Sequence, residues 1–248
     1  MDFTSRYFRR RIQTTMACPS KSLGVNCCQF SCCIPNIPAI DFPINLHPDW
    51  MGNLVQSCPD ITLGEMVIPG THDSGSYSID TFTPFSAVGR TQNATVVEQL
   101  HRGARYLDLR VAQGGRDKVS VFHGCLQGTI LDRIVEDIQI FCQDFPGEFL
   151  IVEVSAEFGR DFKPELKKKA LDTIKNTLGD KLYTENDCKK LMTTPLKDLT
   201  ASGKQVVVML HPRMYEELVV GGTEYTESYV IKEYGFFKSD VWSTSKFQ

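Results

Sequence analysis

The chain has 248 residues, a length that suits one large domain or a domain with an extension. Hydrophobic residues make up 42% and charged residues 23%, as in ordinary soluble globular proteins. The net charge of −3 gives no overall attraction to nucleic acid, and no apolar run reaches the roughly 18 residues that span a bilayer. We therefore expect neither a nucleic-acid partner nor a membrane-spanning segment.

Residues 1–59 differ from the remainder and are expected to form a basic, cysteine-rich, proline-containing extension that is partly disordered. No apolar stretch follows the arginines at its start, as it would in a secretory signal peptide. Five of the nine cysteines lie within residues 18–33. S-acylation beside the basic cluster, zinc binding, a mitochondrial presequence and a tail without a role all remain open. Prolines within 35–48 then favour an extended linker.

Short β-prone runs alternate with helical segments in the rest of the chain. Strands are predicted over 66–68, 104–111, 119–123, 149–154 and 205–210, and helices over 50–55, 95–102, 129–145 and 164–178. Thr129 is expected to cap the third of these helices. The alternation predicts an α/β fold with a parallel sheet. A closed barrel needs eight strands, and only the five strands above are predicted here. We therefore expect residues 60–248 to form a TIM-like (β/α) barrel that is incomplete in its C-terminal half.

Ionisable residues lie at or near the ends of three successive predicted strands. His72 and Asp73 follow a Pro-Gly break after the first run. Asp108 and Arg110 share one face of the second run by strand alternation, and His123 ends the third. Because α/β barrels carry their chemistry at strand ends, we expect these five side chains to form one site.

The predicted site has groups suited to proton transfer at a phosphate ester. Two histidines can divide the work, one removing a proton while the other supplies one. This suits cleavage of a phosphodiester by an internal hydroxyl, because the nucleophile must be activated and the leaving group protonated. Arg110 suits the negative charge that develops on phosphate, and Asp73 or Asp108 could orient an imidazolium.

Two other interpretations of these residues remain open. His72, Asp73 and Asp108 could hold a divalent ion, although Arg110 puts a fixed cation where that ion would lie. Asp108 and Arg110 could also form only an internal ion pair, with no part in catalysis.

Three motifs in this order resemble a known family. Ile-Pro-Gly-Thr-His-Asp-Ser-Gly (68–75), Gln-Leu-His-Arg-Gly-Ala-Arg-Tyr-Leu-Asp-Leu-Arg (99–110) and Phe-His-Gly (122–124) are similar to the catalytic X region of phosphatidylinositol-specific phospholipase C. The closer match is to its bacterial-type and X-domain-containing branch, over roughly residues 60–215. The resemblance implies a TIM-like barrel. It also implies cleavage of phosphatidylinositol or a glycosylated inositol lipid to diacylglycerol and a (cyclic) inositol phosphate.

The resemblance also assigns roles at matching positions. His72 matches the general base that activates the inositol 2-hydroxyl, and His123 matches the general acid for the diacylglycerol oxygen. Asp73 matches the carboxylate partner of that acid. Arg110 matches the arginine that stands in the calcium position of metal-independent members, with Asp108 as the acidic residue beside it. We therefore expect neither a metal nor another cofactor.

Substrate contacts, partner and location follow from the same resemblance. Arg110 is expected to bind substrate, and either Glu153 or Ser155 corresponds to a charged substrate-binding position of the relatives. The expected partner is inositol phospholipid at a membrane surface. The expected location is cytoplasmic with peripheral membrane attachment, or alternatively secreted. Because the C-terminal half is short, a catalytically silent inositol-lipid-binding or regulatory module is the alternative function, and a metal-dependent phosphodiesterase is a third.

Overall fold

The computed structural model describes residues 46–80, 89–184 and 190–215, together with short strands at 219–220, 223–224 and 230–231. The predicted extension over 1–59 lies mostly outside this part of the chain, so its boundary and the roles of its cysteines stay predictions. The first described helix, α2 (Trp50–Ser57), falls within that range and packs against the sheet described below.

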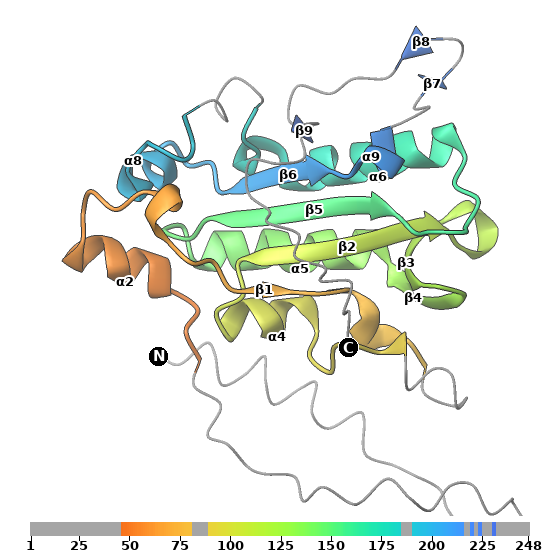
Figure 1. Cartoon of the computed structure of the whole chain (residues 1–248), viewed down its shortest axis with the longest axis horizontal. Helices are drawn as coiled ribbons and strands as arrows, with labels where there is room; N and C mark the ends of the chain where they lie inside the picture. Colours follow the sequence, from red (N-terminus) through yellow and green to blue (C-terminus); the bar gives the residue numbers. More distant parts are fainter. Residues whose placement is uncertain are drawn as a thin grey trace, which may run out of the picture. The chain divides into compact units, whose positions relative to one another are not determined.

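A mixed sheet forms the centre of the fold, with the strand order β4-β3-β2-β5-β6-β9 and with β1 beside β2 (Figure 1). β1, β2, β5, β6 and β9 run parallel, whereas β3 and β4 run antiparallel to their neighbours. Over the described residues the sheet is open and does not close into a barrel. The strands of this sheet are β1 (Gly70–Thr71), β2 (Tyr106–Gln113), β3 (Val119–His123), β4 (Leu126–Ile130), β5 (Leu150–Ala156), β6 (Val206–Leu210) and β9 (Val230–Ile231). A separate ribbon consists of β7 (Val219–Val220) and β8 (Thr223–Glu224).

The α/β alternation is confirmed, but the prediction of a parallel sheet is wrong at β3 and β4. The 3-10 helix η3 (Gly115–Asp117) reverses the chain after β2, and Arg116 within it takes a left-handed φ of 58°. The chain therefore returns antiparallel as β3. β4 occupies residues where a helix was expected to begin. The helix starts only at Leu131, and the Thr129 amide donates to Ser78 Oγ, so Thr129 does not cap it.

Three helices, α4, α5 and α6, cover one face of the sheet (Figure 1). Leu107, Leu109 and Val111 of β2 point to this face, as strand alternation predicted, and are fully buried. β5 is buried along its whole length, as expected for a central parallel strand. The helices are α4 (Val96–His101), α5 (Leu131–Asp144) and α6 (Pro164–Leu178).

The opposite face is divided into an apolar half and an ionisable half. Near the starts of the parallel strands, a second apolar cluster that includes Ile151 lies under short helices. Nearer the C-terminal ends, the same face carries Asp108 and Glu153, which are neighbours across the β2–β5 pair. The cluster lies against α2, η1 (Leu63–Glu65) and α8 (Leu196–Ala201). The remaining short helices are η2 (Ser76–Ser78), η4 (Gly179–Lys181) and α9 (Pro212–Tyr215).

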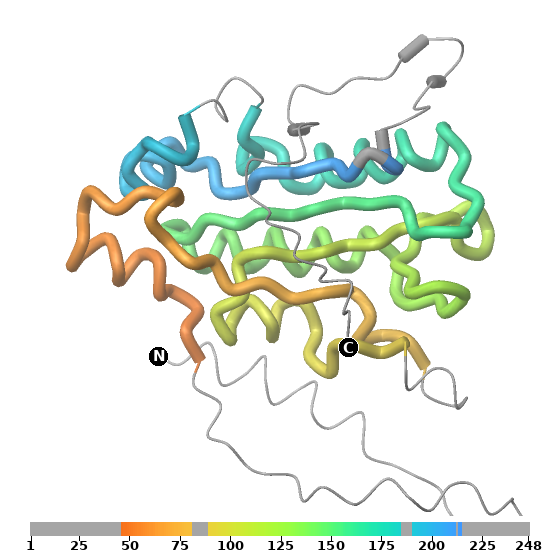
Figure 2. The backbone as a smooth tube through the Cα atoms, viewed as in Figure 1, coloured from red at the N-terminus to blue at the C-terminus, as the bar shows by residue number. Residues whose placement is uncertain are grey.

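Two strands share one edge of β2, and this division creates a fork. β1 pairs only with the start of β2, where Gly70 lies opposite Tyr106 and Thr71 opposite Leu107. The chain then turns away from β2 (Figure 2), and β3 takes the same edge from Val111 onward. The residues after β1 and the end of β3 therefore meet at one place beside β2.

Candidate active site

Just past β1, Ser74 fixes the departing chain to β2. The Ser74 amide donates to the Asp108 carbonyl at 2.8 Å, and Ser74 Oγ accepts the Asp108 amide at 2.9 Å. Asp73, immediately before it, takes a left-handed φ of 46°, which aspartate tolerates better than most non-glycine residues. The Asp73 amide reaches Asp108 Oδ2 at 3.3 Å. This turn places both His72 and Asp73 beside the ionisable half of the sheet.

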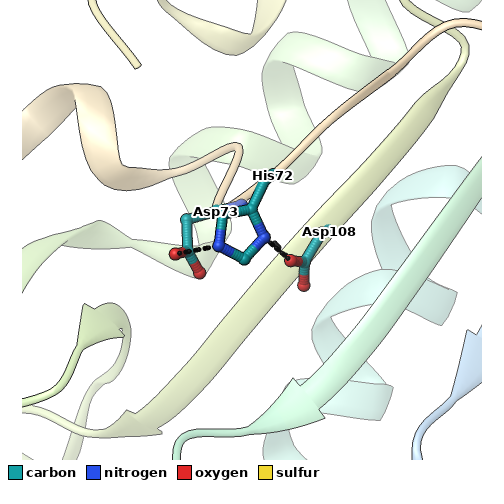
Figure 3. Close-up of side chains that lie close together, drawn as sticks. All are labelled: His72, Asp73 and Asp108. Carbon is teal, nitrogen blue, oxygen red and sulfur yellow. Dashed lines mark hydrogen bonds and ion pairs between the residues drawn. The ribbon is translucent and has the colours of Figure 1, made fainter. Parts of the chain in front are cut away.

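His72 lies between two carboxylates (Figure 3). Its Nδ1 is 3.0 Å from Asp108 Oδ2, and its Nε2 is 3.1 Å from Asp73 Oδ2. The Nδ1 contact has hydrogen-bond geometry, and an ionised carboxylate only accepts, so Nδ1 directs its hydrogen at Asp108. The Nε2 contact with Asp73 lacks that geometry, so Nε2 is the nitrogen that can exchange a proton. The His72 side chain is 45% exposed, so a ligand can reach the imidazole.

Asp73 is a deeply buried carboxylate of the site. Its side chain is 2% exposed, and neither oxygen accepts a hydrogen bond of good geometry from the described residues. Its Oδ1 lies 2.9 Å from Arg110 Nε, so an ion pair partly offsets its desolvation. Burial raises the pKa of Asp73, although the positive charges of Arg110 and His72 oppose the rise. Asp73 therefore holds a proton more readily than an exposed aspartate does.

Arg110 projects from β2 into this cluster of carboxylates. Its Nη2 is 3.4 Å from Asp108 Oδ2 and 3.4 Å from His72 Nδ1. Burial lowers the pKa of Arg110, but the carboxylates of Asp108 and Asp73 outweigh burial, and the net pKa is raised. The guanidinium is thus a fixed cation that can face an anionic ligand.

β3 brings a second histidine to the same carboxylate. Because β3 runs antiparallel and Val121 pairs with Val111, His123 at its end returns to the level of the site. Its Nε2 is 3.7 Å from Asp73 Oδ2, and its Nδ1 is 2.7 Å from the Gly89 carbonyl oxygen. A carbonyl only accepts, so Nδ1 carries its hydrogen there and Nε2 is the proton-exchanging nitrogen. The structure therefore brings all five predicted catalytic side chains together.

The two candidate substrate-binding residues lie on β5 at different depths. Glu153 pairs in register with Asp108, and Ser155 pairs with Arg110. The Tyr106 hydroxyl donates to Glu153 Oε2, and the Glu153 residue is only 2% exposed. Ser155 lies opposite Arg110 in the strand register and is 7% exposed. The assignment of either residue to substrate stays a prediction.

Three of the site residues also meet the distance requirement for a metal. Ligand atoms of His72, Asp73 and Asp108 all lie within 4.8 Å of one another. The Arg110 guanidinium forms ion pairs with both carboxylates, which are the groups that a divalent cation would need as ligands. The arrangement fits a guanidinium in place of a metal, and the expectation that no metal is required stays a prediction.

Sequence reasoning missed several residues that hold the site in place. Glu157, directly after β5, accepts the Gly124 amide through Oε1 at 2.8 Å. Strand alternation along Glu153, Ser155 and Glu157 is a signal that could have found it. The contacts of Ser74 and of the Gly89 carbonyl arise only from tertiary folding, so no local pattern predicts them.

An α/β sheet that carries two histidines and a guanidinium beside buried carboxylates defines a class of site whose groups suit acid–base chemistry. Residues 66–210 match the family described as Phosphatidylinositol-specific phospholipase C, X domain. The chain belongs to this family, which confirms the resemblance drawn from the three motifs.

Known relatives match the chain over part of their length. The human PI-PLC X domain-containing protein 2 is 29% identical over 196 residues, covering 69% of this chain and 62% of that relative. The 1-phosphatidylinositol phosphodiesterase of Listeria monocytogenes is 34% identical over 111 residues, covering 44% and 32%. The solved structure of phosphatidylinositol-specific phospholipase C from Listeria monocytogenes matches with a TM-score of 0.54 at 25% identity, covering 71% of this chain and 61% of that one. The chain thus spans less than two thirds of the length of these relatives. The match supports the TIM-like expectation in part, with an open sheet over the described residues.

Proposed function

We propose that this protein is a phosphoric diester hydrolase of the phospholipase C type. It would cleave phosphatidylinositol or a glycosylated inositol lipid to diacylglycerol and a cyclic or open inositol phosphate. The observation that supports this most is the shared carboxylate: Nε2 atoms of His72 and His123 lie 3.1 and 3.7 Å from Asp73 Oδ2, beside Arg110. Family membership supports the same class of reaction.

In the proposed reaction the two imidazoles act in turn on one phosphorus centre. His72 Nε2 takes the proton of the inositol 2-hydroxyl, whose oxygen attacks phosphorus. His123 Nε2 gives its proton to the diacylglycerol oxygen as the phosphorus–oxygen bond breaks. Asp108 orients His72, Asp73 stabilises the imidazolium of His123, and Arg110 offsets the charge on the phosphoryl oxygens. Water could then open the cyclic product with the two roles reversed.

The remaining parts of the proposal concern substrate and location. Arg110 would bind the phosphate without a metal, and Ser155 or Glu153 would contact the head group. The expected substrate lies in a membrane surface, so the protein would act there by peripheral attachment from the cytoplasm. In the described part of the chain no helix is long and apolar enough to cross a bilayer.

The first test measures diacylglycerol release from phosphatidylinositol vesicles by the full chain in the presence of a chelator. His72→Ala and His123→Ala should each lower turnover by roughly 10²- to 10⁴-fold, because each removes one proton-transfer group. His47→Ala, at an exposed histidine remote in sequence from the motifs, is the matched control and should keep wild-type turnover. Full activity in either of the first two variants would contradict the assignment, and loss of activity in chelator would favour a metal-dependent enzyme.

A catalytically silent lipid-binding module is the second candidate. It is favoured by the open sheet over the described residues. Such a module would bind phosphatidylinositol vesicles in a flotation assay without releasing diacylglycerol. Turnover that depends on His72 would exclude it.

A further inference from the structure

Glu157 is a buried carboxylate next to the site that the proposed reaction does not use. The residue is 7% exposed, and its Oε1 accepts the Gly124 amide at 2.8 Å. Gly124 directly follows His123 and takes a left-handed φ of 59°, where the chain turns sharply at the end of β3. The Glu157 carboxylate is therefore hydrogen-bonded to the backbone of Gly124, the residue that follows His123.

The backbone of Glu157 is itself held firmly. Its amide donates to the Val111 carbonyl at 2.9 Å, which continues the pairing between β5 and β2 beyond the last strand residue. Its negative charge also contributes to the raised pKa of Arg110. Glu157 thus joins the sheet that carries the guanidinium to the turn that carries the acid histidine, and a side chain on a rigid element positions its neighbours well.

The imidazole of His123 makes two polar contacts with the described residues. Its Nδ1 meets the Gly89 carbonyl at 2.7 Å, and its Nε2 lies 3.7 Å from Asp73, beyond hydrogen-bond distance. The place of the ring consequently depends on the backbone around Gly124. Displacement of a catalytic group by about 1 Å can cost about 10²-fold in rate.

The Glu157 carboxylate is buried at a cost to stability, which its attraction to the Arg110 charge opposes. Glu157 Oε2 is buried without a hydrogen-bond partner among the described residues. Burying a charged group with an unpaired oxygen disfavours folding.

We propose that Glu157 is a positioning residue, which holds the Gly124 turn so that His123 Nε2 can reach the leaving-group oxygen. This inference rests on the proposed function, since it concerns the proton donor of that reaction. Glu157→Gln keeps an oxygen that can accept the Gly124 amide, whereas Glu157→Ala removes the acceptor. The pair of variants therefore separates the hydrogen bond from the charge.

The kinetic test measures kcat and KM of both variants on phosphatidylinositol vesicles. Glu157→Ala should lower kcat by tenfold or more with little change in KM, and Glu157→Gln should retain kcat within a few-fold. Glu136→Ala, at an exposed position of α5, is the control and should leave both constants unchanged. Equal losses in the alanine and glutamine variants would overturn the proposal, because the charge rather than the hydrogen bond would then be the important property.

A second measurement does not require turnover and so separates this inference from the proposed function. Hydrogen exchange of the Gly124 amide and the imidazole NMR signals of His123 are recorded for wild type and both variants. We expect slow exchange and one His123 environment in wild type and Glu157→Gln. In Glu157→Ala we expect exchange at least tenfold faster and a shifted or broadened His123 signal. Identical exchange and identical His123 signals in all three proteins would overturn the proposal, whether or not the wild type is an enzyme.

Discussion

Asp73 combines an unusual backbone conformation with a buried charge at the centre of the site. Its left-handed φ lets the amide reach Asp108 while the carboxylate faces Arg110 and both histidines. Each of these features costs stability, and each serves the geometry of the site. Such a residue is expected to show opposite effects of substitution on activity and on stability.

The pH dependence of stability tests this expectation for Asp73→Asn. Burial raises the pKa of Asp73, so the folded protein binds that proton more tightly than the unfolded chain does. The resulting stabilisation is fully present below the ordinary aspartate pKa of about 3.9 and is lost as pH rises through the folded value. Above that value the buried charge disfavours folding. Asp73→Asn should therefore raise the free energy of unfolding near pH 7 while lowering turnover.

Urea denaturation of wild type and Asp73→Asn across pH 4 to 8 measures this difference. The advantage of the variant should grow as pH rises, and Asp161→Asn, at an exposed aspartate, is the control. A variant that is less stable than wild type at pH 7 would show that the ion pair with Arg110 outweighs the burial of the carboxylate.

At the scale of elements, the positions of the strand ends were predicted correctly, but the path of the chain between them was missed. Strand alternation correctly placed Asp108 and Arg110 on one face, because one face of β2 has to pack against helices. The antiparallel return of β3 depends on positive φ angles at Arg116 and Asp117, which arginine usually avoids and aspartate tolerates better. Gly114-Gly115 directly before these residues is a turn signal, so the local sequence could have predicted the hairpin that the parallel-sheet expectation missed. His123 therefore lies at the site because β3 runs antiparallel to β2, and not at the end of a parallel strand as predicted.

Packing at the fork gives a prediction for Gly75→Ala. A Cβ at this position would lie 2.6 and 2.9 Å from the two methyl carbons of Val121 and 3.0 Å from Ile134 Cδ1. These side chains are buried in the core and cannot move without cost. The substitution should destabilise the protein by about 1–3 kcal/mol, as overpacking of cores typically does.

The free energy of unfolding in urea measures the effect of Gly75→Ala. Gly115→Ala is the matched control, because a Cβ there meets no atom within 4 Å. Equal stability of the two variants would show that the turn after β1 can shift away from β3 without loss. The position of His72 would then be less constrained than the packing implies.

At the scale of the whole molecule, a buried ion pair joins three segments far apart in sequence. Arg105 Nη2, just before β2, lies 2.6 Å from Glu148 Oε2, just before β5, and both side chains are at most 1% exposed. Glu148 also accepts the amides of Met51 and Gly52, at the start of α2, a helix without a side-chain cap of its own. The pair therefore binds α2 to the beginning of the sheet, at the end remote from the site.

The sequence contains no local signal for this ion pair. Arg105 and Glu148 are 43 positions apart, and each one lies beside ordinary strand residues. Patterns of period two or 3.6 identify faces of strands and helices, but they do not say which buried charges meet. For the same reason, the composition of residues 1–59 could not show that α2, which falls within this range, packs against the sheet.

The ion pair predicts strong and non-additive effects of mutation. Burial lowers the pKa of Arg105, and the charge of Glu148 opposes this effect. Glu148→Ala would leave a buried guanidinium without its counter-charge and should destabilise the protein by about 3–5 kcal/mol. Arg105→Met should cost a similar amount, because it leaves the Glu148 carboxylate buried and unpaired. The double variant should lose clearly less than the sum of the two, since neither charge then remains.

A double-mutant cycle measured by urea denaturation tests this coupling. The exposed pair of Lys197 and Asp60, 2.7 Å apart, is the control, and Asp60→Ala should change stability little because solvent screens its charge. Additive losses at Arg105 and Glu148 would mean that their backbone partners, rather than the ion pair, hold the three segments together. Because the pair lies at the opposite end of the strands from His72 and His123, its loss should lower the folded fraction without altering kcat per folded molecule.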